Sequence, residues 1–567
     1  MPMRSLRDVA VLALLRLRPT EWQKTLAFAG VIGVLGALAT IGFRQIVLLA
    51  EQLMFGHNEG LVRIALGLQW WERLAVPAVG GIVAGLLLMW SRRVGQRPAG
   101  DYMEAISLGS GDLPVRISLL RAMSSAATVA TGGAIGREGP MVQLAALTGS
   151  LMGRWRQAPI PRRRLMVACG AAAGVATAYS APIAGALFVA EIVLQSVAIE
   201  SLGPLLVSAV TANLTMTAVV GFAPVYHMPT FTLPHTTTAT LALAGLGLVG
   251  GLAAPGYLWL LDRAHAAFGG WHAASWLKLG TGGLIVGALS IASPSVWGNG
   301  YSVVNSILQG DWAWTALLAV LLLKLLAVAG TTGSGAVGGI FTPTLFMGAV
   351  AGALFGTFVQ HFWPGVLPMP ASVAVGMGVF LAACTHAPLM SVLMIFEMTE
   401  NYGVVVPLML ACVLGYFISR GLRADSIYSS GRAAAPSPKL AIAADVLRAD
   451  CATVRVGQSV RELEEVFLRY RWQHVYVLDG AGKFVGAISL HDFAPLLRDA
   501  AAAGGWPSQL VRTDYPRVND VTPSWQVLET FATHPGERLP VLDREGRLLG
   551  HVTKTDLVLM FRELLSG

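Results

Sequence analysis

Apolar stretches follow one another closely along the first 420 residues or so. Residues 25–43 and 205–223 reach the roughly 20 residues that a helix needs to cross a bilayer. Others, such as residues 371–384, are too short, and many contain Gly or Pro. Short or broken helices at membrane depth are tolerated only where they pack inside protein or line a cavity. The pattern predicts an all-α polytopic membrane domain over residues 25–432.

The membrane domain contains an internal repeat. GGAIGREGP (132–140) is similar to SGAVGGIFTP (334–343), and APIAGALFVAE (181–191) is similar to APLMSVLMIFE (387–397), at offsets of 202 and 206 residues. Related halves, here about 25–225 and 235–430, often have inverted topology in transporters, and interrupted segments at equivalent places mark the binding site. We therefore expect two inverted repeats with the binding site at the two glycine-rich runs.

A different pattern begins after a linker at residues 433–443. Residues 474–493 and 538–557 each read as a short β-rich run, a turn with Gly, a second strand and a helix start, 64 residues apart. The sequence therefore predicts a second, α/β domain over residues 444–567. Its two repeats are expected at about 444–500 and 508–567.

Composition agrees with a membrane protein: 54% of the 567 residues are hydrophobic and 13% are charged, against about 25% charged in soluble domains. The net charge of +8 lies beside apolar segments, at residues 4–24, 92–97, 154–164 and 420–432, which is typical of the cytoplasmic side of a membrane rather than of nucleic-acid binding. Residues 1–24 are expected to form an amphipathic segment on that face, not a cleaved signal. The four cysteines have no paired spacing, so we expect neither a disulfide framework nor a metal site.

An ionisable pair, Arg137 and Glu138, interrupts the first glycine-rich run. A carboxylate at membrane depth is expensive and is a functional candidate, although the two charges could simply neutralise each other. The surrounding glycines allow close backbone approach, and Pro140 favours the first turn of a helix. These glycines are Gly132, Gly133, Gly136 and Gly139. A glycine-rich loop that leads into a helix N-terminus suits an anion.

The equivalent run in the second half, which contains Gly339, Ile340 and Phe341, has no charged residue. Two facing helix N-termini could therefore hold an anion mostly through backbone N–H groups. An ionised Glu138 would occupy and block that site, and a protonated one would leave it. One side chain could then serve as both gate and proton carrier.

The GREGP, GGIFTP and paired AP…E motifs resemble those of the CLC chloride channels and proton/chloride antiporters, over roughly residues 25–430. RPAGDYMEAI (97–106) and WGNGYS (297–302) look most like the bacterial ClcB branch, and residues 444–567 resemble a pair of CBS repeats. The resemblance implies a homodimer in a bacterial-type inner membrane, with both termini cytoplasmic and one pathway for chloride or a similar anion per subunit.

By position, the resemblance makes Glu138 the external gating glutamate. Gly136, Arg137 and Gly139 would lie at the anion site, with the N–H groups of Ile340 and Phe341 lining it. Tyr428 would contact the central anion through its hydroxyl group, whereas local sequence alone favours an interfacial aromatic anchor.

Two departures from the family pattern concern the pathway. The serine loop expected before the Met-Glu-Ala-Ile run is replaced by a stretch containing Arg97, Pro98, Ala99 and Gly100, and GSGDLP (109–114) is interpreted as an unrelated loop. Ile192 stands where antiporters of the best-known type carry a second, proton-transferring glutamate. Glu191 is then a possible proton relay, although Glu397 occupies the equivalent repeat position, which favours a structural role.

In the second domain, Ser489 with Asp492 and Thr553 with Asp556 open equivalent helices. A hydroxyl at a helix N-terminus suits phosphate, and the resemblance to CBS repeats implies that the aspartates could bind the ribose of an adenine nucleotide. The alternative is a dimer-forming module without a ligand. No other cofactor is expected.

These patterns indicate an anion transport protein rather than an enzyme, with a passive channel slightly favoured over a proton/chloride antiporter. From other classes, a CBS-bearing magnesium transporter would need inward-facing carboxylates, and the paired runs offer one. A hydrolase would need a nucleophile with a base, and no such pair is evident. Lys324, within LLLKLLAV, is expected to snorkel or to form an ion pair.

Overall fold

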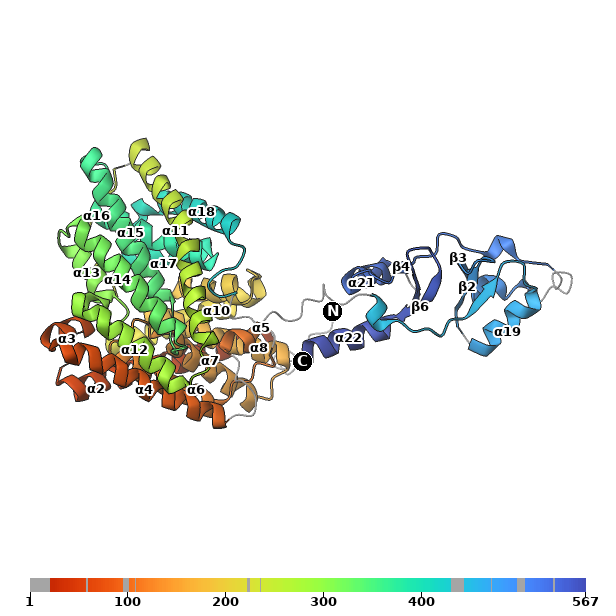
Figure 1. The fold of residues 1–567 in the computed structure, drawn as a ribbon, viewed down its shortest axis with the longest axis horizontal. Helices are drawn as coiled ribbons and strands as arrows, with labels where there is room; N and C mark the ends of the chain where they lie inside the picture. The colour runs from red at the N-terminus through yellow and green to blue at the C-terminus, as the bar shows by residue number, and fades with distance from the viewer. Residues whose placement is uncertain are drawn as a thin grey trace, which may run out of the picture. The chain divides into compact units, whose positions relative to one another are not determined.

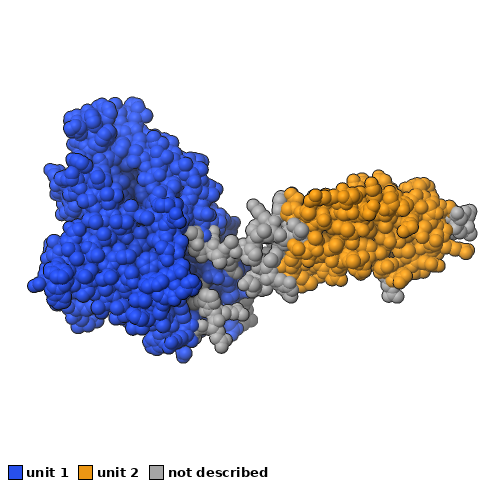
Figure 2. Space-filling view, in the orientation of Figure 1, with its two compact units in different colours: residues 1–431 blue, residues 432–567 orange. Residues whose placement is uncertain are grey.

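The computed structural model describes residues 21–57, 60–94, 101–107, 109–221, 225–234, 236–429, 443–470, 472–496, 505–533 and 536–566. The chain forms two compact units, Met1–Gly431 and Arg432–Gly567 (Figure 2). Within the described ranges the first unit is helical, and the strands all lie in the second (Figure 1). An all-α domain followed by an α/β domain is what the hydrophobic pattern predicts.

Eight helices of the described part of the chain are long and apolar enough to cross a membrane. They are α2 (Glu21–Phe55), α4 (Trp70–Val94), α10 (Ile199–Val220), α11 (Thr237–Gly270), α12 (Ser275–Ala292), α14 (Trp314–Gly333), α15 (Phe341–Phe362) and α18 (Val405–Leu422). The apolar stretch at 25–43 lies inside α2, whose 35 residues give a length of about 52 Å. A helix so much longer than the roughly 30 Å hydrocarbon core must tilt or extend beyond it.

The other α-helices described in this unit do not meet the length and hydropathy of a membrane span. They are α3 (Leu61–Gly67), α5 (Tyr102–Ser107), α6 (Val115–Ala130), α7 (Glu138–Trp155), α8 (Ile160–Tyr179), α9 (Pro182–Leu187), α13 (Tyr301–Gln309), α16 (Met369–Thr385) and α17 (Pro388–Thr399). A π-helical turn, Phe188–Val193, continues α9, and 3₁₀ turns occur at Pro294–Val296 and Tyr402–Val404. Every residue of α16 from Ala371 to Thr385 is buried, so this short apolar segment does pack inside protein as expected.

The two halves repeat the same packing. Helix α7 packs on α8 as α15 packs on α16, and α8 packs on α10 as α16 packs on α18. Similarly, α2 packs on α10 as α11 packs on α18, and α4 packs on α6 as α12 packs on α14. The halves meet through α4 with α12 and through α9 with α17. These equivalent contacts relate the two repeats by an approximate two-fold axis.

The second unit contains two three-stranded sheets, each with one parallel and one antiparallel pairing. The first comprises β1 (Thr453–Arg455), β2 (His474–Leu478) and β3 (Phe484–Ser489), and the second comprises β4 (Val518–Asn519), β5 (Arg538–Leu542) and β6 (Leu548–Thr553). Helices α19 (Val460–Tyr470) and α20 (Leu490–Phe493) accompany the first sheet, and α21 (Ser524–Thr533) and α22 (Lys554–Ser566) the second. The register preserves the 64-residue repeat, because His474 faces Ser489 and Arg538 faces Thr553.

Candidate functional site: two facing helix N-termini

The two glycine-rich runs lie against each other in the middle of the first unit. The Gly136 N–H donates to the Gly339 carbonyl over 2.7 Å, and the Gly339 N–H donates to the Gly136 carbonyl over 2.8 Å. Helix α7 begins at Glu138 and α15 at Phe341, directly after these contacts. The first N–H groups of a helix have no partner within it and carry its positive dipole end. Tertiary packing therefore brings two anion-attracting helix ends together, as the repeat predicts.

Glu138 lies between these two loops and is only 4% exposed. Its Oε1 atom accepts a hydrogen bond from the Tyr301 hydroxyl over 2.7 Å, while Oε2 is buried and has no partner among the described residues. A Cβ atom on Gly136 would overlap Oε2, and one on Gly339 would lie 3.3 Å from it. The absence of a side chain at Gly136 thus makes room for the carboxylate.

Arg137 does not neutralise Glu138. The structure describes no ion pair between them, and the Arg137 guanidinium lies over the Tyr301 ring instead, 5.8 Å from its centroid. The alternative in which the two adjacent charges simply satisfy each other is therefore not what the structure contains. Glu138 is available for another role.

Four tyrosines lie close enough to Glu138 for its charge to act on them: Tyr179, Tyr226, Tyr301 and Tyr428. The sequence pointed only to Tyr428. Tyr301 was missed, although it belongs to the WGNGYS motif and is the first residue of α13, after Gly300 at φ +99°. The sequence signal for Tyr301 is the glycine directly before it, because a glycine at a helix start followed by a polar aromatic residue indicates a tightly placed hydroxyl group.

Tyr428 joins an aromatic cluster rather than standing alone. Its ring lies 5.7 Å from that of Phe188, Phe188 lies 6.1 Å from Phe341, and Phe341 lies 4.9 Å from Tyr179. Ile340 is the residue immediately before α15 and Phe341 is its first residue. The structure thus links Tyr428 to the start of α15 through Phe188, and the contact of the Tyr428 hydroxyl with an anion stays a prediction.

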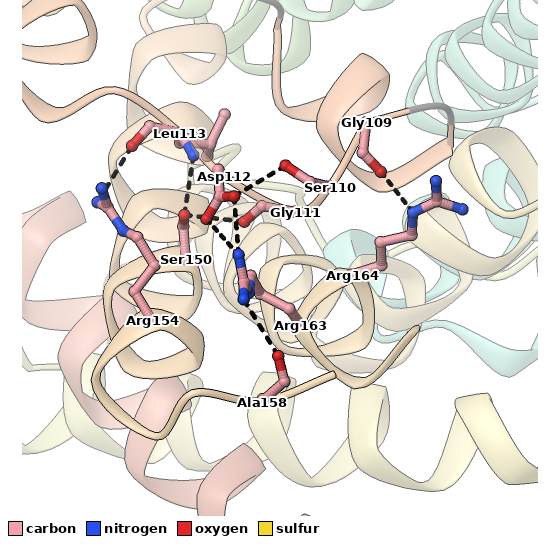
Figure 3. Close-up of polar contacts among 10 residues, drawn as sticks. All are labelled: Gly109, Ser110, Gly111, Asp112, Leu113, Ser150, Arg154, Ala158, Arg163 and Arg164. Atoms are coloured by element: carbon pink, nitrogen blue, oxygen red, sulfur yellow. Dashed lines mark hydrogen bonds and ion pairs between the residues drawn. The ribbon is translucent and has the colours of Figure 1, made fainter. Parts of the chain in front are cut away.

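Arg97, Pro98, Ala99 and Gly100, the divergent loop, lie outside the described residues. The neighbouring GSGDLP stretch is described and is fastened to the end of α7 and the start of α8 (Figure 3). Asp112 pairs with Arg163 at 2.7 Å, and the Ser150 hydroxyl bonds both Leu113 N–H and the Gly111 carbonyl. Ser150 is twelve residues along α7 from Glu138, about 18 Å. This loop therefore anchors the far end of α7 and takes no part in the glycine-loop site.

Glu191 and Glu397 have matching structural contacts. Glu191 accepts the N–H groups of Leu389 and Met390 at the start of α17, over 3.3 and 2.7 Å. Glu397 accepts those of Ile183 and Ala184 at the start of α9, over 2.9 and 2.8 Å. A carboxylate at a helix N-terminus is favoured by the helix dipole. Both oxygens of Glu191 are therefore engaged in capping, and Ile192 beside it is buried.

Lys324 neither snorkels nor forms an ion pair, contrary to expectation. It is fully buried in α14, and its Nζ atom donates to the carbonyls of Val296 (2.8 Å) and Gly298 (2.5 Å), with Trp297 at 3.4 Å. These carbonyls precede α13 and Tyr301, so the ammonium group fastens the loop that presents the Tyr301 hydroxyl to Glu138. Carbonyl oxygens satisfy a buried ammonium group where water cannot.

In the second unit, an arginine holds each of the two candidate nucleotide-binding aspartates. Arg448 forms two 2.7 Å bonds to Asp556, and Arg512 bonds Asp492 at 2.7 and 3.1 Å. Arg448 lies 64 residues before Arg512, as Asp492 lies 64 residues before Asp556. These donors hold the pKa of both carboxyls below their usual range. Arg448 lies at the start of the first repeat and binds Asp556 of the second, and Arg512 lies at the start of the second repeat and binds Asp492 of the first.

The hydroxyls beside these aspartates also have partners. Ser489 accepts the His491 N–H over 3.1 Å, and the Thr553 hydroxyl donates to Asp556 over 2.7 Å. Arg448 binds both oxygens of Asp556, whereas Arg512 binds only Oδ2 of Asp492. Each candidate aspartate thus already has an arginine partner, and nucleotide binding at these residues stays a prediction.

The fold and this site define a class: an integral membrane protein with two inverted repeats that place two helix N-termini around a buried, titratable carboxylate. The Voltage gated chloride channel family model matches residues 80–420, and the CBS domain model matches residues 443–499 and 508–563. The chain belongs to the voltage-gated chloride channel (CLC) family, whose members transport anions and are not enzymes. The magnesium-transporter and hydrolase alternatives therefore do not apply.

Individual relatives support the same assignment. A ClcB-like relative from Ralstonia nicotianae is 52% identical over 410 residues, covering 71% of this chain and 95% of that protein. The voltage-gated ClC-type chloride channel ClcB of Citrobacter koseri is 43% identical over 410 residues, covering 71% and 98%. The crystal structure of a slow cyanobacterial Cl⁻/H⁺ antiporter is 25% identical, covers 72% of this chain and 96% of that one, and has a TM-score of 0.64.

Proposed function

We propose that this protein conducts chloride passively through a pathway that Glu138 opens and closes. The observation that carries the proposal is the buried Glu138 carboxylate between the starts of α7 and α15, held by Tyr301. Ionised, the carboxylate occupies the place that two helix dipoles make favourable for an anion. Protonation removes its charge and its strongest attraction to that place, and chloride can then enter.

Two observations favour a passive channel. The relative from Citrobacter koseri carries the name of a chloride channel. In addition, Ile192 has no titratable group, and the neighbouring carboxylate of Glu191 is occupied by Leu389 and Met390. A proton that reached Glu138 would therefore meet an apolar barrier on its way across the membrane.

The second candidate is a proton/chloride antiporter, which the similarity to the cyanobacterial antiporter favours. In that case Glu138 would exchange protons with one side of the membrane, and water or Glu191 would carry them to the other. Both candidates need Glu138 to titrate. They differ in whether its proton crosses the membrane.

The pH dependence of the gate depends on the groups that face Glu138. These are the four tyrosines, from α8, from the segment before α11, from α13 and from the segment after α18, together with the Arg137 guanidinium over Tyr301. Arg44 and Glu51 of α2 lie within electrostatic range of Arg137.

We place the turn between α7 and α8 on the cytoplasmic side of a bacterial-type inner membrane, because its arginines follow the positive-inside rule. These arginines are Arg154, Arg156, Arg162, Arg163 and Arg164. Glu138, at the other end of α7, then faces outward, and both termini are cytoplasmic. As the family resemblance implies, the working unit is a homodimer with one pathway per subunit.

The CBS pair is proposed to regulate this pathway from the cytoplasm. If it binds an adenine nucleotide at Asp492 or Asp556, the ribose would share that carboxylate with Arg512 or Arg448 or displace the arginine. Binding would then weaken the arginine–aspartate contact between the two repeats, so that the ligand would change how the repeats are held together. Without a ligand, the arginines hold the two repeats together.

The test uses proteoliposomes with chloride and pH recorded at the same time. Glu138→Gln mimics the neutral carboxyl, so chloride flux should persist and lose its dependence on pH. Glu200→Gln, an exposed carboxylate at the start of α10, is the matched control and should leave the pH dependence unchanged. A Glu138→Gln variant with wild-type pH dependence would disprove the gate.

The same vesicles distinguish the two candidates. A steep chloride gradient is imposed without a pH gradient, and a protonophore provides the control. A passive channel moves no protons uphill. Sustained proton movement that disappears in Glu138→Gln would establish the antiporter instead.

A further inference from the structure

A carboxylate that gates by protonation must exchange protons with water, yet Glu138 is buried in this conformation. Its only described partner is Tyr301, and Oε2 has none among the described residues. Direct access from bulk water is therefore closed at the carboxylate itself. The proton has to arrive through a neighbouring group.

The neighbouring groups form a continuous row of hydroxyls. The Tyr301 hydroxyl lies 2.7 Å from Glu138 Oε1 and 3.1 Å from the Thr342 hydroxyl, which lies 2.9 Å from the Tyr179 hydroxyl. Thr342 is fully buried in the first turn of α15, and Tyr179 ends α8. The three hydroxyls come from three different helices, so packing alone creates the row.

Proton counting fixes the direction of these bonds. An ionised carboxylate only accepts, so the single hydroxyl proton of Tyr301 goes to Glu138. Thr342 must then donate to Tyr301, and Tyr179 must donate to Thr342. The row is therefore oriented toward Glu138 throughout, and the Tyr179 oxygen is left as the acceptor at its far end.

Tyr179, the last residue of the row, also lines a cavity. Tyr179 and Tyr226 line a cavity of about 470 Å³, whose other walls include His227, Gln309 and Glu400. These last three residues are exposed, whereas Tyr179 and Tyr226 are 3% and 2% exposed. A polar cavity of this size holds water. Tyr179 therefore belongs both to the hydroxyl row and to the wall of this cavity.

We propose that Tyr179, Thr342 and Tyr301 relay protons between water in this cavity and Glu138, an inference that rests on the proposed gating role of Glu138. A proton from a cavity water binds the Tyr179 oxygen while the Tyr179 proton passes to Thr342. The Thr342 proton passes to Tyr301, and the Tyr301 proton passes to Glu138 Oε1. One O–H bond breaks and one forms at each hydroxyl, and the net change is one proton moved from water to the carboxylate.

Tyr226 supplies a matched control within the same cluster. Its ring lies 5.3 Å from that of Tyr301, and it lines the same cavity. Its hydroxyl is buried and has no partner among the described residues, so it is not a member of the row. Tyr226→Phe therefore removes a neighbouring hydroxyl without breaking the relay.

The test measures how fast Glu138 is protonated in the full-length protein in lipid nanodiscs, where both faces experience the same pH. A rapid drop in pH is followed by infrared absorption of the carboxyl group, and Glu138→Gln identifies the Glu138 band. Tyr179→Phe and Thr342→Val should slow protonation at least tenfold and leave the final protonated fraction at each pH nearly unchanged. Tyr226→Phe should stay within twofold of wild type.

Thr342→Ser is the control for a purely structural effect of Thr342→Val. It keeps the hydroxyl group, so Glu138 should be protonated at a rate close to that of the wild-type protein. Wild-type rates in both Tyr179→Phe and Thr342→Val would overturn the relay and leave the gate intact. If no Glu138 band titrates in the wild-type protein, the gate itself fails and the relay fails with it. The pH dependence of chloride flux in the wild-type protein separates these outcomes, because it persists when only the relay fails and is absent when the gate fails.

Discussion

Glu191 caps the helix that carries Glu397, and Glu397 caps the helix that leads into Glu191. The Glu191 carboxylate binds the first N–H groups of α17, which carries Glu397, and the Glu397 carboxylate binds those of α9, which continues into the turn that carries Glu191. The two residues are 206 positions apart, the offset of the sequence repeat. The contact ties the two halves together at their approximate two-fold axis and assigns Glu191 the structural role that its repeat position suggested.

Replacing either carboxylate should destabilise the first unit without changing the ion selectivity of the pathway. Glu191→Ala and Glu397→Ala each remove two bonds to a charged acceptor, so we expect each to lower the free energy of unfolding by about 2–4 kcal/mol. Tryptophan fluorescence in a denaturing-detergent titration measures the change. A Glu191→Gln variant of wild-type stability that loses proton movement would instead assign Glu191 as a relay.

Tyr301→Phe should weaken the closed state of the gate. A hydrogen bond to a charged group contributes about 1.5–3 kcal/mol, and 1.4 kcal/mol corresponds to a tenfold change in an equilibrium. Chloride flux at alkaline pH should therefore rise about tenfold or more, while flux at acidic pH changes little. Tyr226→Phe is the control, and equal alkaline flux in the Tyr301→Phe and wild-type proteins would contradict the prediction.

Lys324→Met should act through Tyr301. The change leaves the Val296 and Gly298 carbonyls buried without their donor, which costs roughly 1–3 kcal/mol each. We expect lower stability and, in the protein that folds, the same raised alkaline flux as Tyr301→Phe. Combining the two changes should raise the flux no further, because both loosen one contact. Additive effects of the two changes on flux would show that Lys324 acts elsewhere.

The arginine pairs of the second unit should stabilise it in a pH-dependent way. Arg448 and Arg512 hold the pKa of Asp556 and Asp492 below the ordinary value of 3.8, so their contribution to stability is fully present above that value. It is lost as the pH falls through the lower folded-state pKa. Arg448→Gln and Arg512→Gln should lower the melting temperature of this unit by a few degrees at about pH 7. The difference from wild type should shrink as the pH falls below 3.8, and a gap independent of pH would contradict the assignment.

The same arginines should compete with a nucleoside. Adenosine, which has no phosphate to attract arginine, tests the competition directly by calorimetry on the full-length protein. Arg448→Gln and Arg512→Gln free the aspartates and should raise adenosine affinity up to about fivefold, the scale of an exposed ion pair. Adding Asp492→Asn and Asp556→Asn should abolish that gain. If calorimetry detects no heat of adenosine binding in the wild-type protein or in any variant, adenosine is not a ligand of the CBS pair.

The sequence by itself determined the features that depend on local pattern. Apolar stretches, helix-starting glycine loops and repeated motifs are written in neighbouring residues, because span length, backbone freedom and periodicity act over a few turns. They predicted the membrane domain, the two repeats, the pair of α/β repeats and Glu138 as a candidate functional carboxylate. The family followed from the same short motifs.

Only the tertiary structure decided which distant groups meet. Tyr301 lies 163 positions from Glu138, Met390 lies 199 from Glu191, and Asp556 lies 108 from Arg448. Helix and strand packing sets these contacts, and no local periodicity encodes them. Lys324 illustrates the point, because a lone lysine in an apolar run reads as a snorkelling residue until the fold places three carbonyls around its Nζ atom. A buried charge is satisfied by whatever the fold brings within reach.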